Sequence, residues 1–205
     1  MASIIKSDNG VSSGITGIVQ SADSSGQLAL QTTTSSGTAT TAVTIDNTQK
    51  VTFANSIVPN NTSGIVGVTD GSNANAGVVG EYVSSQVTAT STGLTSGVAA
   101  NATSISLTAG DWDVSGAVFV NQASGTTLSL VYASINTTSA TNQGAVTGYS
   151  TYLQTTFTTS GGCGTPVPTL RLSLSSTTTV YLVVAATFAV STAGAGGFLR
   201  ARRVR

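Results

Sequence analysis

Histidine is absent from the sequence, and cysteine occurs once, as Cys163. The lack of histidine removes the commonest general base and the side chain that holds most transition metals in proteins. A single cysteine cannot form a disulfide within the chain, so no oxidising compartment is implied. With no histidine to activate it, Cys163 in the run GGCG is expected to be a loop thiol rather than a nucleophile. We therefore expect a protein without enzymatic activity and without a cofactor.

Charge is also scarce, because only 7% of the 205 residues are charged, against roughly 25% in ordinary globular domains. The formal net charge is zero, but all the charged residues after position 170 are arginines. The polar surface must consist mainly of Ser, Thr, Asn and Gln. Such a weakly charged surface associates readily unless it is covered. This composition favours a subunit of an assembly over a free enzyme.

Long hydrophobic runs are missing as well. The longest, residues 180–190, is interrupted by Thr187 and is too short to span a bilayer. The first ten residues, MASIIKSDNG, lack the apolar segment of a signal peptide. We expect no membrane insertion.

Threonine, valine and glycine are abundant, whereas the helix formers Glu, Lys and Arg are rare, so the sequence predicts an all-β protein. Apolar and polar residues alternate between positions 111 and 120, and residues two apart share one face of a strand. Trp112, on the apolar side of this strand, is expected in the core rather than on a sugar-binding surface. The apolar side is Trp112, Val114, Gly116, Val118 and Val120; the other side is Asp111, Asp113, Ser115 and Ala117, with Phe119 as an exception.

Residues 1–57 read as a separate N-terminal domain of four short alternating segments bounded by Gly, Ser, Asp or Asn. Its apolar content is thin for a domain of this size to fold alone. Identical copies could supply the missing wall, and an intertwined homotrimeric β-prism is the expected solution. The apolar content of this domain includes Ile15, Ile18, Leu28, Leu30, Val43 and Ile45.

Residues 58–92 are expected to form a linker with one short helix, at about residues 76–87. Val79, Tyr82 and Val83 lie at helical spacing there, and Asn75 could cap the N-terminus. Two glycines weaken this helix, so it would persist only when packed as three copies about an axis. Val79, Tyr82 and Val83 are therefore predicted to lie in a trimer interface.

Residues 93–205 are predicted to form a β-sandwich, with turn signals at the expected intervals. Residues 180–190 are apolar at nearly every position, which predicts cover on both faces. A neighbouring subunit would supply the second cover, which adds Tyr181 and Val183 to the expected trimer interface. Glycine-rich stretches at 160–164 and 193–197 are expected as exposed loop tips. The predicted strands are residues 104–107, 112–120, 127–135, 149–158, 170–174, 180–190 and 198–204.

Two groups of charged residues require an interpretation. Asp111 and Asp113 are expected to be solvated beside a turn, with a shared Ca²⁺ site or a glycosidase pair as alternatives. The arginines in FLRARRVR are expected to pair with aspartates and carbonyl groups at a subunit interface. Contact with an acidic capsid or host surface, or with nucleic acid, are the alternatives for these arginines. We expect no metal and no nucleic acid.

The order of several segments carries a resemblance. VGEYVSSQV, LTSGVAANATSISLTAGDWDVSGAVFV, TTTVYLVVAATFAV and RARRVR together resemble small virion proteins of tailed bacteriophages. SGITGIVQSADSSGQLALQT and TIDNTQKVTF are similar to attachment segments of phage fibre and head-appendage proteins. The resemblance implies a homotrimer whose C-terminal domain is a jelly-roll or tumour-necrosis-factor-like sandwich. It also implies that the N-terminal part is an attachment domain that docks on the particle while the sandwich projects. The residues expected to make this contact are Ile15, Ile18, Leu28, Leu30, Val43 and Ile45.

These observations lead to a structural hypothesis. The chain is expected to be a homotrimeric fibre or decoration protein of a virion, with itself and the capsid, neck or tail proteins as partners. The alternative is a receptor-binding module that recognises a host-surface glycan or protein through loop tips at 121–125, 136–148 and 160–164. The residues expected at that receptor surface are Asn121, Asn142, Tyr149 and Tyr152.

Overall fold

A computed structural model describes residues 3–9, 16–21, 25–33, 35–58, 70–158 and 161–205. The chain divides into two compact units, Met1–Gly67 and Val68–Arg205. Every regular element in the described ranges is a strand. The all-β prediction is therefore confirmed.

The N-terminal unit holds one five-stranded sheet in the order β2-β1-β3-β4-β5. Four of its strands match the four predicted segments, whereas β1 was not expected. The pairing of β1 with β3 is parallel, and the other pairings in the sheet are antiparallel. The strands are β1 (Ser3–Asn9), β2 (Thr16–Ser21), β3 (Leu28–Thr33), β4 (Ala39–Ile45) and β5 (Val51–Phe53).

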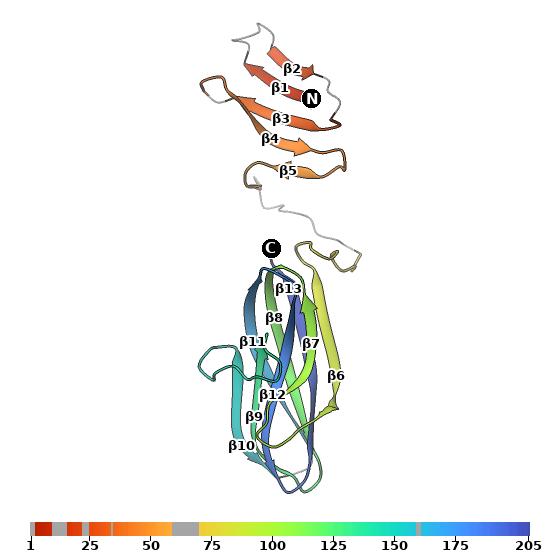
Figure 1. Cartoon of the computed structure of the whole chain (residues 1–205), viewed down its shortest axis with the longest axis vertical. Helices are drawn as coiled ribbons and strands as arrows, with labels where there is room; N and C mark the ends of the chain where they lie inside the picture. The colour runs from red at the N-terminus through yellow and green to blue at the C-terminus, as the bar shows by residue number, and fades with distance from the viewer. Residues whose placement is uncertain (1–2, 10–15, 22–24, 34, 59–69, 159–160) are drawn as a thin grey trace. The chain divides into compact units, whose positions relative to one another are not determined.

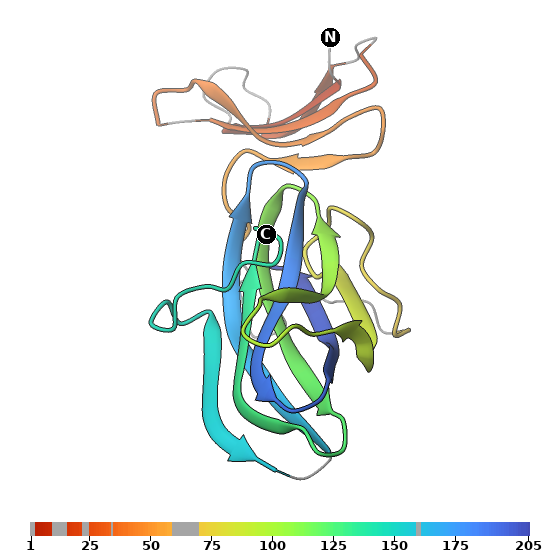
Figure 2. The ribbon, with the colours of Figure 1, turned by 60° about the horizontal axis from the view of Figure 1, so that its bottom comes forward.

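The second unit is a sandwich of two antiparallel four-stranded sheets, with the orders β10-β9-β12-β7 and β11-β8-β13-β6 (Figures 1 and 2). The predicted β-sandwich is thus confirmed, and its alternation of strands between sheets is consistent with a jelly roll. The strands are β6 (Tyr82–Gly93), β7 (Ala100–Leu107), β8 (Gly110–Gln122), β9 (Thr127–Asn136), β10 (Ser150–Phe157), β11 (Gly161–Leu174), β12 (Thr178–Ala189) and β13 (Ala193–Arg203).

The core lies between the two sheets of the sandwich. Strand β8 contributes the predicted apolar side, because Trp112, Val114 and Val120 have no exposed surface and Val118 is 1% exposed. Strands β9 and β12 face it with Leu128, Val131, Ile135, Val180, Leu182 and Val184, all fully buried. The period-two pattern therefore identified the inner face of the central strand correctly.

The predicted helix at 76–87 is wrong. Residues 82–87 belong to strand β6, which pairs with β13, and residues 76–80 form turns. Gly77 and Gly80 have φ values of 84° and 92°, which a right-handed helix does not allow. Val83 and Val87 satisfy a strand as well as a helix, and the ladder with β13 decides between the two.

The second cover of strand β12 comes from the chain itself, not from a neighbouring subunit as expected. Val183 pairs with Asn101 on one side and Ser134 on the other. Asn101 binds Ser139 and Ala140, and Ser134 binds the Gln143 amide, so the β9–β10 connection at residues 137–149 crosses this outer face. Val183 is consequently fully buried within the single chain.

Both glycine-rich stretches expected as loop tips belong to strands in the described residues. Residues 161–164 begin β11, and residues 193–197 begin β13, where Ala195 is fully buried. A Cβ at Gly196 would lie 1.8 Å from the Thr88 carbonyl oxygen, so the backbones of β13 and β6 approach closely there. Glycine is required at this point for packing rather than for a turn.

Replacing Gly196 with alanine tests this close approach. We expect Gly196→Ala to lower the free energy of unfolding by about 2–3 kcal/mol, because the new methyl group collides with backbone that cannot rotate away. Chemical denaturation followed by tryptophan fluorescence measures the loss. Gly93→Ala is the matched control, since a Cβ there meets nothing within 4 Å. Equal stability of the two variants would contradict the expectation.

Candidate functional site

The outer face of the β11-β8-β13-β6 sheet is the most distinctive surface of the sandwich. Its side chains are the ones that alternate with the core positions, and the pattern predicts that they should be polar. Four of them are apolar. Three of these form one row across three neighbouring strands, and the fourth lies in the next row of the same sheet. They are Ala117 and Phe119 on β8, Phe198 on β13 and Pro166 on β11; we call them the apolar face.

The register of the sheet brings these residues together. Ala117 pairs with Pro166 on one side and with Phe198 on the other, and Phe119 pairs with Gly164 and Gly196. A Cβ on Gly162 would lie 1.9 Å from the Phe119 ring, so this ring rests across the glycine backbone of β11. The ring stays 42% exposed. The glycines opposite Phe119 thus leave space for its large apolar side chain, which remains partly exposed in the single chain.

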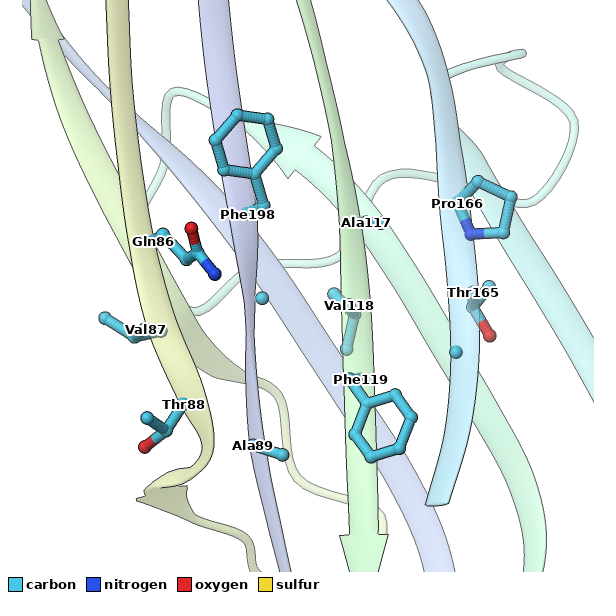
Figure 3. Close-up of a pocket in the computed structure, with 12 residues that line it drawn as sticks. Gln86, Val87, Thr88, Ala89, Ala117, Val118, Phe119, Thr165, Pro166 and Phe198 are labelled. Carbon is cyan, nitrogen blue, oxygen red and sulfur yellow. The ribbon is translucent and has the colours of Figure 1, made fainter.

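A shallow hollow of about 450 Å³ lies on the apolar face (Figure 3). Figure 3 shows the rings of Phe119 and Phe198 on neighbouring strands, with Gln86 of β6 and Pro166 of β11 on either side. A second hollow of about 440 Å³ shares Ala117, Pro166 and Phe198 with the first. The hollows follow one continuous stretch of sheet rather than an enclosed cleft.

The same face becomes charged toward the far end of β13. A third hollow of about 360 Å³ there is lined by Tyr82, Asp113, Arg200 and Arg202, among others. The Arg200 Nε donates a hydrogen bond to Ser115 Oγ at 3.0 Å. Arg202 pairs in register with Tyr82 and Asp113. The face therefore combines an apolar half with a polar half.

Arg203 is buried inside the same end of the sandwich, where its guanidinium group is hydrogen-bonded. Its Nε donates to Glu81 Oε2 at 2.9 Å, and its other nitrogens donate to the carbonyl of Ala109 and the hydroxyl of Thr108. Its guanidinium carbon lies 4.3 Å from the centre of the Trp112 ring, a cation–π contact. Burial raises the pKa of Glu81, but the Gly77 N–H and the Arg203 guanidinium outweigh it and hold that pKa below its ordinary value.

Asp111 is buried, contrary to the expectation of a solvated residue. Arg171 binds both of its carboxylate oxygens, at 2.8 Å each, and Arg205 Nε binds Oδ2 at 2.8 Å. The hydrogen bond from Arg171 lowers the pKa of Asp111 and outweighs burial, with the charges of Arg171 and Arg205 adding to it. The oxygens that a shared Ca²⁺ with Asp113 would need are thus already occupied by cations, and no group of three His, Cys, Asp or Glu side chains occurs in the described residues.

Of the four arginines in FLRARRVR, Arg203 and Arg205 pair with carboxylate or carbonyl groups of the same chain rather than at the expected subunit interface, whereas Arg200 binds the Ser115 hydroxyl. Cys163 is buried in β11 with its sulfur 4.0 Å from Thr165 Oγ1, so it is a core thiol and not a loop thiol.

In the described part of the chain no helix is long and apolar enough to cross a membrane.

The expected receptor residues do not form one surface. Asn121 lies near the end of β8 and is half-buried. Asn142 and Tyr149 lie in the connection that leads to β10, where Asn142 contacts Ser134, and Tyr152 lies in β10, where its ring meets the Tyr132 ring edge to face at 5.6 Å. Tyr149 and Tyr152 are 40% and 51% exposed.

The expected trimer-interface residues are scattered. Val79 lies in an exposed turn, and Tyr82 and Val83 lie on opposite faces of β6. Tyr181 is half-buried and Val183 is fully buried under residues 137–149. The apolar face was missed by sequence reasoning, although Phe119 was its visible signal as the one large apolar residue on the polar side of β8.

Four of the expected docking residues share one face of the N-terminal sheet: Leu28, Leu30, Val43 and Ile45. Ile18 lies in β2, and Ile15 lies outside the described residues.

No family model matches the chain, and no curated protein matches it. Among solved structures, infectious bursal disease virus of the Gx strain matches with 12% identity and a TM-score of 0.39, covering 79% of this chain and 43% of that one. The VP2 subviral particle of infectious bursal disease virus matches with 13% identity and a TM-score of 0.35, covering 79% and 42%. The chain thus spans less than half of the solved chains it matches.

Acid should weaken the ion pair between Arg203 and Glu81. A carboxylate whose pKa is lowered by folding stabilises the fold above its unfolded pKa, and this stability is lost as the pH falls below about 4. We expect Glu81→Gln to lose about 2–3 kcal/mol at pH 7 and to show a flatter loss of stability from pH 5 to pH 3. Urea unfolding across this pH range measures both effects. Asp113→Asn, at an exposed position, is the control and should match the parent at pH 7.

Proposed function

We propose that this protein is a structural component of a virion that acts as a homotrimer, attached through its N-terminal unit and displaying the sandwich. The observation that carries the proposal is the apolar face on the β11-β8-β13-β6 sheet. An exposed sheet face normally carries polar side chains, and a contiguous apolar patch on a soluble protein marks an interaction site.

Self-association follows from the composition of this face. The apolar half supplies surface whose burial is favourable, at about 1.5–3 kcal/mol for a fully buried Phe side chain. The polar half carries both signs of charge, Asp113 and the arginines Arg200 and Arg202, so copies can pair these groups across an interface. A charge content of 7% leaves little electrostatic repulsion between copies.

Three copies and a place on a virion come from the resemblance to small proteins of tailed-phage particles. Attachment of the N-terminal unit to capsid, neck or tail proteins has the same basis. The division of the chain into two compact units supports a division of labour between attachment and display.

The assembly proposal is tested by polar substitutions on the apolar face. We expect the wild-type protein to be a trimer and the double variant Phe119→Ser, Phe198→Ser to be largely monomeric, since both substitutions leave the inner core unchanged. Size-exclusion chromatography with light scattering and native mass spectrometry measure the mass. Val146→Ser, at a 99% exposed position of the β9–β10 connection, is the control. A monomeric wild type, or a folded double variant that remains trimeric, would overturn the proposal.

Receptor binding is a second candidate function, supported by the exposed tyrosines of the other sheet. Tyr149 and Tyr152 expose ring surface together with hydroxyl groups, and such groups bind sugars and proteins.

Host adsorption and glycan arrays test this second candidate. We expect Tyr152→Ala to reduce binding about tenfold while the protein remains trimeric. Val190→Ala, exposed in the β12–β13 turn, is the control. Absence of any specific binding by the wild type would leave the structural role alone.

A further inference from the structure

One face of the N-terminal sheet is apolar across three strands. The register pairs Leu28 with Ile45 and Ile45 with Val51, and it pairs Leu30 with Val43 and Val43 with Phe53. Because residues paired in an antiparallel ladder share a face, these two rows lie on the same side of the sheet. We call them the N-terminal apolar rows: Leu28, Ile45 and Val51, and Leu30, Val43 and Phe53.

The chain leaves these rows largely open. Leu30, Val51 and Phe53 are 37%, 48% and 46% exposed. Among residues 25–33 and 35–58, Ala29 is the only apolar residue that is buried. A sheet needs a second apolar layer to form a core, and a unit of this size without one does not stay folded alone. The missing layer must therefore come from outside the described sheet.

The rows carry no charged side chain. The charged residues nearest to them in the sequence, Asp46 and Lys50, lie in the β4–β5 turn, where Asp46 accepts hydrogen bonds from the Thr48 and Lys50 amides. A hollow of about 440 Å³ beside Val43 and Phe53 is completed by threonine, alanine, asparagine and serine. A surface of this composition is complementary to another apolar, uncharged surface, and an identical copy offers one in equal number.

From these observations we infer that the N-terminal apolar rows are closed by the same rows of sister copies of this chain. The inference rests on the proposed homotrimer, because association of the sandwiches would tether the N-terminal units to one another through residues 54–81. Tethering of this kind raises the effective concentration into the millimolar range, which favours a contact too weak to form between free chains. The apolar side chains of Leu28, Leu30, Val43 and Ile45 then lie between copies rather than against the particle.

Cysteine cross-linking in the purified full-length protein tests the inference. Val51→Cys places a thiol on the apolar rows, and Thr52→Cys, the next residue of β5, places one on the opposite side of the same strand. Both positions are exposed in the single chain. The buried thiol of Cys163 is present in both variants, and the wild-type protein measures its background.

With a short bis-maleimide reagent we expect covalent multimers from Val51→Cys at a yield at least tenfold above that from Thr52→Cys. Light scattering on the same samples reports whether the chain is oligomeric. An oligomer in which the two variants cross-link equally, or not at all, overturns the inference and leaves the proposed homotrimer standing. A monomeric wild type overturns both.

Exchange of backbone amide hydrogens provides a second measurement that needs no substitution in the N-terminal sheet, in case Val51→Cys disturbs it. We expect amides of β3 and β4 to exchange at least tenfold more slowly in the wild-type protein than in the monomeric Phe119→Ser, Phe198→Ser variant. The inner strand β9 of the sandwich should be protected in both. Equal exchange of β3 and β4 in the trimer and the monomer would overturn the inference.

Discussion

A β-sheet requires apolar cover on at least one face, and this requirement decides how the chain is built. The sandwich satisfies it internally, since Trp112 and its neighbours on β8 are buried against β9 and β12. Strand β12 even obtains cover on its second face from residues 137–149. Two sheet faces remain for which the described part of the chain supplies no cover: the one that carries Phe119 and Phe198, and the one that carries Val51 and Phe53. The proposed assembly is the consequence of these two faces.

The sequence predicted the strands well where one pattern dominated. The alternation around Trp112 identified the inner face of β8, and all seven strands expected after residue 93 occur. The helix at 76–87 failed because residues four apart, such as Val83 and Val87, share one face in a strand as well as in a helix, and only the partner strand β13 distinguishes the two structures. The glycines at 193–197 were interpreted as a loop because glycine usually marks turns, whereas here the backbone of β6 passes too close for any side chain.

The candidate site was less accessible to sequence reasoning. Phe119 was visible as an irregularity in an otherwise polar row, but its neighbours on β11 and β13 are set by sheet register, which the sequence does not determine. The Arg203–Glu81 pair joins residues 122 positions apart, so no local pattern could indicate it. The burial of Asp111 could not be predicted for the same reason, because the arginines that cover it come from β11 and from residue 205.

Strand β13 lies between β8 and β6 in its sheet, although it is the last strand of the sequence. During synthesis the preceding seven strands of the sandwich therefore emerge with a gap in the middle of one layer. Strand β6 has no ladder partner in that sheet until residues 194–202 are available. A chain cut short before these residues exposes an open seam, so only chains translated through this point can close the sandwich and enter an assembly.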